Sequence, residues 1–198
     1  MFDATTPSPP RISLALLAVG VMFALLPDLP NDALALDRQG VLAGQWWRLW
    51  SGHFVHFSLA HALSDLAALF VLGAGVEMEF GPRFLLRLCA IGLPLLSAML
   101  LLVSPDLASY RGASGLCVAV GVLFGLRLWD QHKDLHVFLL VCAIVLATKI
   151  WFEARGAAMN FASLSQDITI SWAAHLLGAA IGVVAFLIHA RHMRATHC

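Results

Sequence analysis

A short run of small residues around Ser114 has the composition of a nucleophile site. Gly112 and Gly115 flank Ala113 and Ser114 between two long apolar runs, and glycine lets another backbone approach the serine closely. If a helix begins here, the backbone N–H of Ser114 has no helical partner and can hold a developing oxyanion. Small residues are also common at helix starts that have no catalytic role, so a catalytic partner for Ser114 must be found elsewhere in the chain to support this interpretation.

His175 is the candidate for the base that a serine nucleophile needs, because an imidazole can take the hydroxyl proton and return it to the leaving amine. Each of the two residues is followed on its own helical face by two glycines, which are Gly121 and Gly125 after Ser114, and Gly178 and Gly182 after His175. Stripes of small residues let membrane helices pack closely. Contact between these two stripes would bring Ser114 to His175. No carboxylate is obviously placed to orient His175, so the prediction is a Ser–His dyad. The bland alternative is that the glycines only pack helices and that His175 bonds a neighbour.

Further histidines precede this pair in the chain. His61 and Asp65 are four residues apart and share a helical face, and His61 is the candidate oxyanion donor near Ser114. His53 and His56 have an HxxH spacing that raises the alternative of a metal site. Zinc usually takes three or four ligands with help from Cys or carboxylate, and no cysteine lies nearby in the sequence. We therefore expect no metal and no other cofactor.

The composition shows which kind of protein must position these groups. Of the 198 residues, 60% are hydrophobic and 12% are charged, and the mean hydropathy is +0.84. Soluble domains average about 25% charged residues, so the chain is predicted to be an integral membrane protein. Acidic and basic residues balance at 12 each, which gives no sign of nucleic-acid binding. The cysteines show no CxxC spacing and are predicted to be buried free thiols rather than a disulfide framework; they are Cys89, Cys117, Cys142 and Cys198.

Six apolar runs approach the length of about 20 residues that a helix needs to cross a bilayer. They cover residues 12–26, 57–76, 84–103, 114–129, 135–152 and 171–190. The predicted fold is an all-α membrane bundle of six transmembrane helices, forming one domain over 12–190 with cytoplasmic tails at 1–11 and 191–198. Residues from about 27 to 56 carry Trp46, Trp47 and Trp50 beside Arg48, and this segment is predicted to lie along the membrane interface with short helical pieces.

Six spans put both termini on the same side of the membrane. With the termini inside, seven Lys and Arg residues fall in inner segments and five fall in or near outer ones, which favours cytoplasmic termini. In this orientation Ser114, His61 and His175 all lie at the outer ends of their helices. Three polar groups from non-adjacent spans would then share one depth in the membrane.

These motifs together resemble the rhomboid intramembrane serine proteases. The resemblance covers most of the chain, from about Trp46 to Gly182. The motifs that carry it are Trp46-Trp47-Arg48, His53 and His56, His61 with Asp65, Gly75 with Glu77 and Gly81, Gly112-Ala113-Ser114-Gly115, and His175 with Gly178 and Gly182. It implies a six-helix rhomboid-like bundle, Ser114 as nucleophile and His175 as base, and a membrane-anchored protein as substrate.

Two details refine the resemblance. The small size of the chain, with Lys149 and Glu153 in the fifth run, is similar to the rhombosortase branch, whose bacterial members are associated with trimming C-terminal GlyGly-CTERM tails of exported proteins. That branch implies the bacterial inner membrane. Rhomboids usually have an oxyanion-binding Asn at the position of Asp65. An ionised Asp only accepts hydrogen bonds, so Asp65 must be protonated or must orient His61 instead.

The predicted function is an intramembrane serine endopeptidase that cleaves membrane-anchored proteins near the outer face. A catalytically inactive relative that binds client transmembrane helices is one alternative. A small transporter that moves protons through the intramembrane histidines is another.

Overall fold

The computed structural model describes residues 9–25, 32–156 and 172–196. Over these residues the chain is built from helices, with no strand and a single isolated β-bridge between Leu36 and Tyr110. The order is α1 (Arg11–Ala24), α3 (Arg38–Leu42), α4 (Arg48–Ser51), α5 (Leu59–Phe80), α6 (Pro82–Val103), α7 (Ser114–Gln131), the 3₁₀ turn η1 (Lys133–Leu135), α8 (His136–Ala154) and α9 (Trp172–Thr196). The predicted all-α fold is confirmed.

A helix covers each of the six predicted apolar runs. Within the described residues, four segments are long and apolar enough to cross a membrane, namely Leu59–Phe80, Pro82–Val103, Lys133–Ala154 and Trp172–Ala195, and Arg11–Ala24 is a shorter apolar helix. The chain is therefore an integral membrane protein, while the count of six spans and the proposed tail boundaries stay predictions. Residues 1–8 of the predicted N-terminal tail, and residues 197–198 of the C-terminal tail with Cys198 among them, lie outside the described residues.

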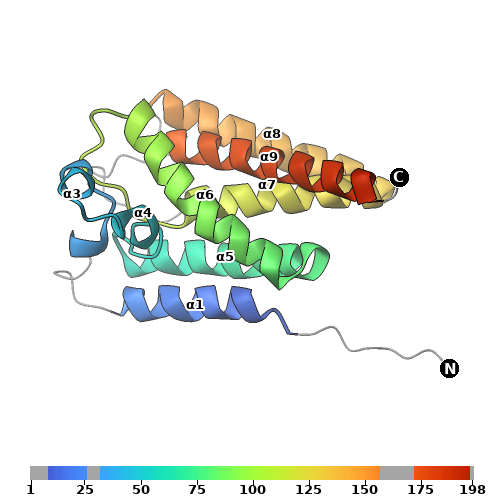
Figure 1. Ribbon diagram of the computed structural model, residues 1–198. Helices are drawn as coiled ribbons and strands as arrows, with labels where there is room; N and C mark the ends of the chain where they lie inside the picture. Colours follow the sequence, from blue (N-terminus) through green and yellow to red (C-terminus); the bar gives the residue numbers. More distant parts are fainter. Residues whose placement is uncertain (1–8, 26–31, 157–171, 197–198) are drawn as a thin grey trace.

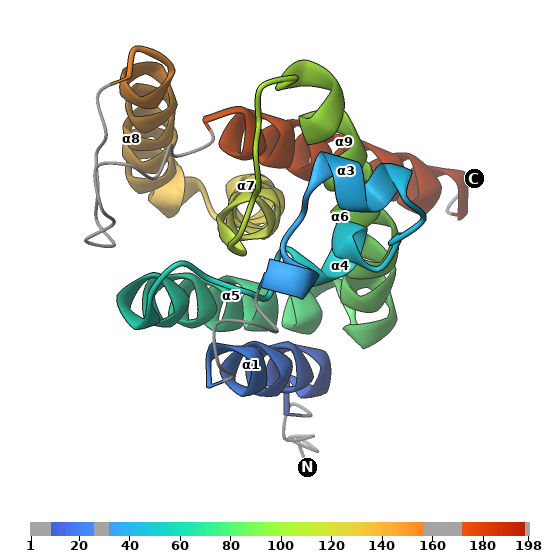
Figure 2. The same cartoon turned by 90° about the vertical axis from the view of Figure 1, so that its left-hand side faces the viewer.

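Helix α7 occupies the middle of the bundle (Figure 2), where it packs against α5 on one side and α9 on the other. Helix α1 lies outside α5, and α8 contacts the bundle along α9 and α7. The beginnings of α5, α7 and α9 and the end of α8 lie at one end of the bundle, together with α3 and α4 (Figure 1). The beginning of α1 and the end of α9 lie at the opposite end.

Glu77 holds the outlying α1 in place. Pro10 precedes this helix and provides no side-chain cap, so the first backbone N–H groups need another acceptor. The buried Glu77 carboxylate of α5 supplies it, since Oε1 accepts from Ile12 N at 3.0 Å and Oε2 accepts from Ser13 N at 2.8 Å and Ser13 Oγ at 2.9 Å. A negative charge at a helix N-terminus is also favourable to the helix dipole.

The segment before α5 contains the predicted short helices, α3 and α4, and its tryptophans are exposed. Trp46, Trp47 and Trp50 have exposed fractions of 61%, 52% and 41%, as expected for rings that lie at a membrane interface. The expectation that Arg48 would join them there is wrong. Arg48 is buried and donates to the backbone oxygens of Asp32 and Ala35, because a looped backbone has carbonyls that no helix satisfies.

The cysteines are only partly as predicted. Cys89 and Cys117 are buried free thiols, whereas Cys142 is free but exposed on α8. The difference arises because α8 buries almost none of its surface against the bundle, and its apolar side chains face outward, where lipid would surround them.

Candidate active site

Helices α7 and α9 cross with almost no space between their backbones. A Cβ atom added to Gly178 would lie 2.1 Å from the carbonyl oxygen of Gly115, and one added to Gly182 would lie 2.4 Å from the carbonyl oxygen of Ala119. A Cβ added to Gly115 would in turn lie 3.1 Å from the carbonyl oxygen of Ala174. Glycine is therefore required at this crossing, as the stripe after His175 predicted.

The face predicted for the other stripe is wrong. A Cβ at Gly121 would meet Leu72 of α5 at 3.3 Å, and one at Gly125 would only reach Leu139 of α8 at 4.0 Å. Because α7 is packed on several sides, the residues that face α9 are Gly115 and Ala119, about 100° and about 140° around the helix from Ser114. Ser114 shares a helical face with Gly121, the glycine that lies against α5.

The crossing lies next in sequence to both predicted catalytic residues. Ser114 precedes Gly115, and His175 follows Ala174, so each candidate is adjacent to a residue of the Gly115–Ala174 contact. Ser114 is half-buried and His175 is 4% exposed. No side chain caps the N-terminus of α7, which leaves its first N–H groups available to an anion.

Gly112 allows the chain to reach this position. Its φ of +122° lies in a region that favours glycine. A Cβ there would be 2.9 Å from the His61 ring and 3.0 Å from Asp65 Oδ2. Its backbone N–H also donates to the Gly52 carbonyl at 3.0 Å. The loop that leads to Ser114 therefore lies directly on the His61–Asp65 pair.

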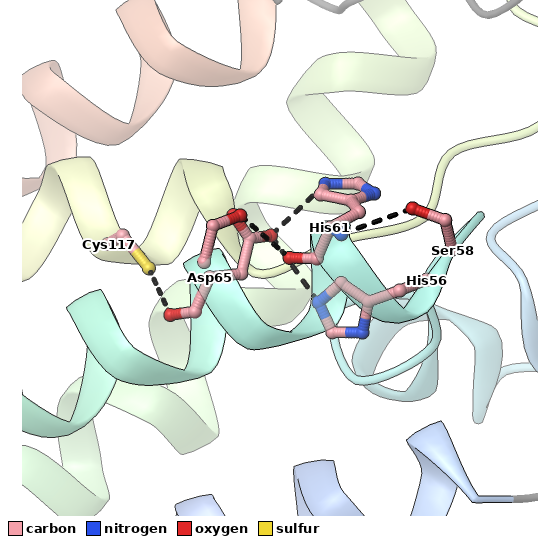
Figure 3. Close-up of polar contacts among 6 residues, drawn as sticks. His56, Ser58, His61, Asp65 and Cys117 are labelled. Carbon is pink, nitrogen blue, oxygen red and sulfur yellow. Dashed lines mark hydrogen bonds and ion pairs between the residues drawn. The ribbon is translucent and has the colours of Figure 1, made fainter. Parts of the chain in front are cut away.

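Asp65 lies between two histidines (Figure 3). Its Oδ2 is 3.3 Å from His61 Nε2 and 3.4 Å from His56 Nε2, and all three side chains are buried. The two imidazole rings are perpendicular, with centroids 5.0 Å apart. An ionised carboxylate can only accept from these rings, and the orienting role of Asp65 toward His61 stays a prediction. His61 Nδ1 has no partner within the described chain.

His53 and His56 do not share a partner, despite their HxxH spacing. His53 Nε2 donates to Ser97 Oγ of α6 at 2.9 Å, and Ser97 donates onward to the Leu49 carbonyl. Burial lowers the pKa of His53 to about 4, so this ring is neutral at physiological pH. Within the described ranges, no group of three or more His, Cys, Asp or Glu side chains is arranged to hold a metal ion.

Two residues near the site were missed by the sequence reasoning. Tyr110 is buried, and its hydroxyl, which has no hydrogen-bond partner in the described chain, would lie 3.4 Å from a Cβ on Gly115. Burial raises the pKa of Tyr110, so its phenol stays neutral. Its position in the sequence just before the Ser114 motif could have indicated that Tyr110 lies near the site.

The second residue is Glu153, which was named in the fifth apolar run but not connected to His175. Its carboxylate Oε2 lies 2.7 Å from His175 Nδ1. The expectation that no carboxylate orients His175 is wrong. Spacing could not reveal the contact, because Glu153 is on α8 and the intervening segment includes the undescribed residues 157–171. An acidic residue inside an apolar run was the signal that could have suggested a partner.

Comparison with known proteins assigns this arrangement to a family. A rhomboid domain model matches residues 43–192, which is most of the chain. The chain belongs to the rhomboid family. It is also 31% identical over 152 residues to rhomboid-like protein 11, a chloroplastic protein of Arabidopsis thaliana, and the match covers 70% of this chain. The chain spans about half the length of that relative, 51%.

Proposed function

We propose that this rhomboid-family chain is an intramembrane serine endopeptidase, with Ser114 as nucleophile and His175 as general base. The observation that carries the proposal is the crossing of α7 and α9, where Gly115 and Gly178 put the two backbones in contact beside both residues. Ser114 begins α7 and His175 is in the first turn of α9, and these two helices begin at the same end of the bundle (Figure 1). A structural role alone would not require a serine at the uncapped start of the central helix.

In the proposed reaction, Ser114 Oγ attacks the carbonyl carbon of a peptide bond while His175 Nε2 takes the hydroxyl proton. The negative charge that forms on the carbonyl oxygen is stabilised by the N-terminus of α7. His61 adds to this from Nδ1, the ring nitrogen that Asp65 does not face, and this donation requires a proton on both ring nitrogens. His175 then gives its proton to the leaving amine, and an acyl-enzyme remains on Ser114. Attack by water on this ester releases the second product and restores the serine.

The substrate class follows from where the site lies. The site is at the end of the bundle where α5, α7 and α9 begin, and the charge distribution of the sequence favours this as the outer face. A substrate helix must unwind there to expose a carbonyl, and exposed backbone in lipid costs several kcal/mol. We therefore expect cleavage of a transmembrane segment of a membrane-anchored protein, close to the outer face and beside small, helix-breaking residues.

A narrower version of the proposal is rhombosortase activity on C-terminal GlyGly-CTERM tails in a bacterial inner membrane. Its support is the Lys149 and Glu153 pair that carried the branch resemblance. Co-expression with a tail-anchored secreted protein tests it, since removal of the tail would reduce the size of that protein. A tail that stays uncut while another membrane-anchored substrate is cleaved would reject the branch but not the protease.

Labelling with a fluorophosphonate probe tests the catalytic proposal directly. Ser114 Oγ would bond to phosphorus, fluoride would leave, and His175 would take the proton. We expect the purified protein in detergent to be labelled, and Ser114→Ala and His175→Ala to be unlabelled while they remain folded, because members of a catalytic unit depend on one another. An unlabelled wild-type protein would favour the inactive, helix-binding alternative. Strong labelling of Ser114→Ala would show that another residue is the nucleophile.

A further inference from the structure

Helix α8 buries one side chain, and that side chain is a carboxylate. Of its residues from His136 to Ala154, all of which the structure describes, Glu153 alone is buried, and the side chain is 1% exposed. Its Oε2 lies 2.7 Å from His175 Nδ1 of α9, and its Oε1 pairs with Lys149 Nζ one turn earlier on α8. Both carboxylate oxygens therefore have a partner, and the two partners lie on different helices.

Burying a carboxylate inside a membrane bundle is costly unless the charge is paired. The Lys149 ammonium supplies that charge, so the carboxylate remains ionised and can only accept from His175. A separation of 2.7 Å is typical of a charge-assisted hydrogen bond. The proton of the neutral imidazole is then on Nδ1, and the lone pair is on Nε2. This is the tautomer that a general base for Ser114 requires.

We propose that Glu153 is a positioning residue, which holds His175 in this tautomer and orientation and stabilises the imidazolium that forms during the reaction. The catalytic unit would then be Ser114, His175 and Glu153, with Lys149 keeping Glu153 ionised and in place. The inference rests on the proposed protease function. It adds that α8, which contributes no other buried side chain, must be docked on α9 for His175 to be correctly held.

The competing explanation is that Glu153 only anchors α8 to the bundle. The two explanations differ in what they require of the side chain. An anchor needs shape and a hydrogen bond, which a glutamine provides and a shorter aspartate does not. A positioning residue needs a negatively charged carboxylate beside the imidazole, which an aspartate keeps and a glutamine lacks.

The test compares Glu153→Gln and Glu153→Asp in the full-length protein in detergent. A fluorophosphonate probe gives two constants, the maximal inactivation rate kinact and the half-saturating concentration KI. A carboxylate partner of a catalytic histidine is commonly worth orders of magnitude in rate, and we expect kinact to fall about 10- to 1000-fold in Glu153→Gln with KI unchanged within about twofold. Glu153→Asp should retain more of the wild-type kinact than Glu153→Gln.

Glu79→Gln is the matched control. Glu79 also ends a helix and pairs with a cation, Arg127 at 3.1 Å, but it lies at the opposite end of α5 from the site. We expect wild-type kinact in this variant. Thermal unfolding midpoints of all variants separate loss of chemistry from loss of fold.

Several outcomes would overturn the inference. A kinact for Glu153→Gln within twofold of wild type, or above that of Glu153→Asp, would show that Glu153 is an anchor. An equal loss in Glu79→Gln would show that the effect is not specific to His175. If Glu153→Gln does not fold, a folded Glu153→Leu decides instead, because full kinact without any carboxylate beside His175 would exclude a positioning role. An unlabelled wild-type protein would overturn the proposed function and this inference with it, whereas a labelled wild type with an unaffected Glu153→Gln would overturn the inference alone.

Discussion

The close approach of Gly178 to the backbone of α7 predicts the effect of adding one methyl group at this position. In Gly178→Ala, the new Cβ would be 2.1 Å from the Gly115 carbonyl oxygen, whereas real Cβ atoms essentially never approach a neighbour within 3.0 Å. The obstacle is backbone, which cannot rotate away as a side chain can. Helices α7 and α9 must therefore move apart by roughly one ångström.

Such a shift would separate Ser114 from His175 without changing either residue. A misplacement of about 1 Å between reacting groups can cost about 100-fold in rate, so we expect fluorophosphonate labelling of Gly178→Ala to slow by about that factor. Overpacking of this kind typically destabilises a core by about 1–3 kcal/mol. The thermal unfolding midpoint should fall, but the protein should remain folded.

Gly125→Ala is the control for this prediction, because a Cβ there meets only the tip of Leu139 at 4.0 Å, an ordinary contact. Replacing glycine by alanine inside a helix without strain usually stabilises by about 0.4–1 kcal/mol. We expect wild-type labelling and an unchanged or higher unfolding midpoint. Labelling of Gly178→Ala at the wild-type rate would refute the assigned crossing, and with it the argument that this contact brings the catalytic pair together.

Three further predictions follow from contacts around the site and from the α1 cap. Asp65→Asn should change the labelling rate only modestly, because an amide oxygen still accepts from a histidine. The labelling rates of Asp65→Leu and His61→Ala should each fall by about 10²–10³-fold, as when an oxyanion donor is lost. A near-wild-type rate for Asp65→Leu would exclude any catalytic part for this carboxylate. Gly112→Ala should lose labelling, since its Cβ would be 2.9 Å from the His61 ring at a φ of +122°; a fully active variant would mean that the loop can move freely. Glu77→Leu leaves the buried Ser13 N–H and hydroxyl without an acceptor, and should lower the free energy of unfolding by about 1–3 kcal/mol or more. An unchanged thermal unfolding midpoint in detergent would show that α1 is held by apolar contacts instead.

The sequence alone determined the class of the protein and named the candidates for its chemistry-bearing residues. Apolar runs long enough for a bilayer leave few alternatives to helices, because every backbone group in lipid must be bonded within its own segment. The helices therefore follow the predicted runs within a few residues. Gly178 and Gly182 were also assigned correctly, since a glycine stripe after an intramembrane histidine has an evident use in close packing.

Only the tertiary structure decided which face meets which helix. Periodicity places Ser114, Gly121 and Gly125 on one side of α7, but it does not say whether α5, α8 or α9 covers that side. In the structure Gly121 packs against α5, whereas Gly115 and Ala119 contact α9. A central helix has neighbours on every side, so its residue pattern does not indicate which neighbouring helix packs against which face.

The same reason explains the residues that spacing could not connect. Glu153 and His175 are 22 positions apart on different helices, and Asp65 is shared by His56 of a loop and His61 of its own helix. Local periodicity relates residues within one helix, whereas a hydrogen bond between helices depends on how those helices are rotated and docked. The sequence thus named Ser114 and His175 as the candidate nucleophile and base, and the packing of α8 against α9 placed the Glu153 carboxylate beside His175.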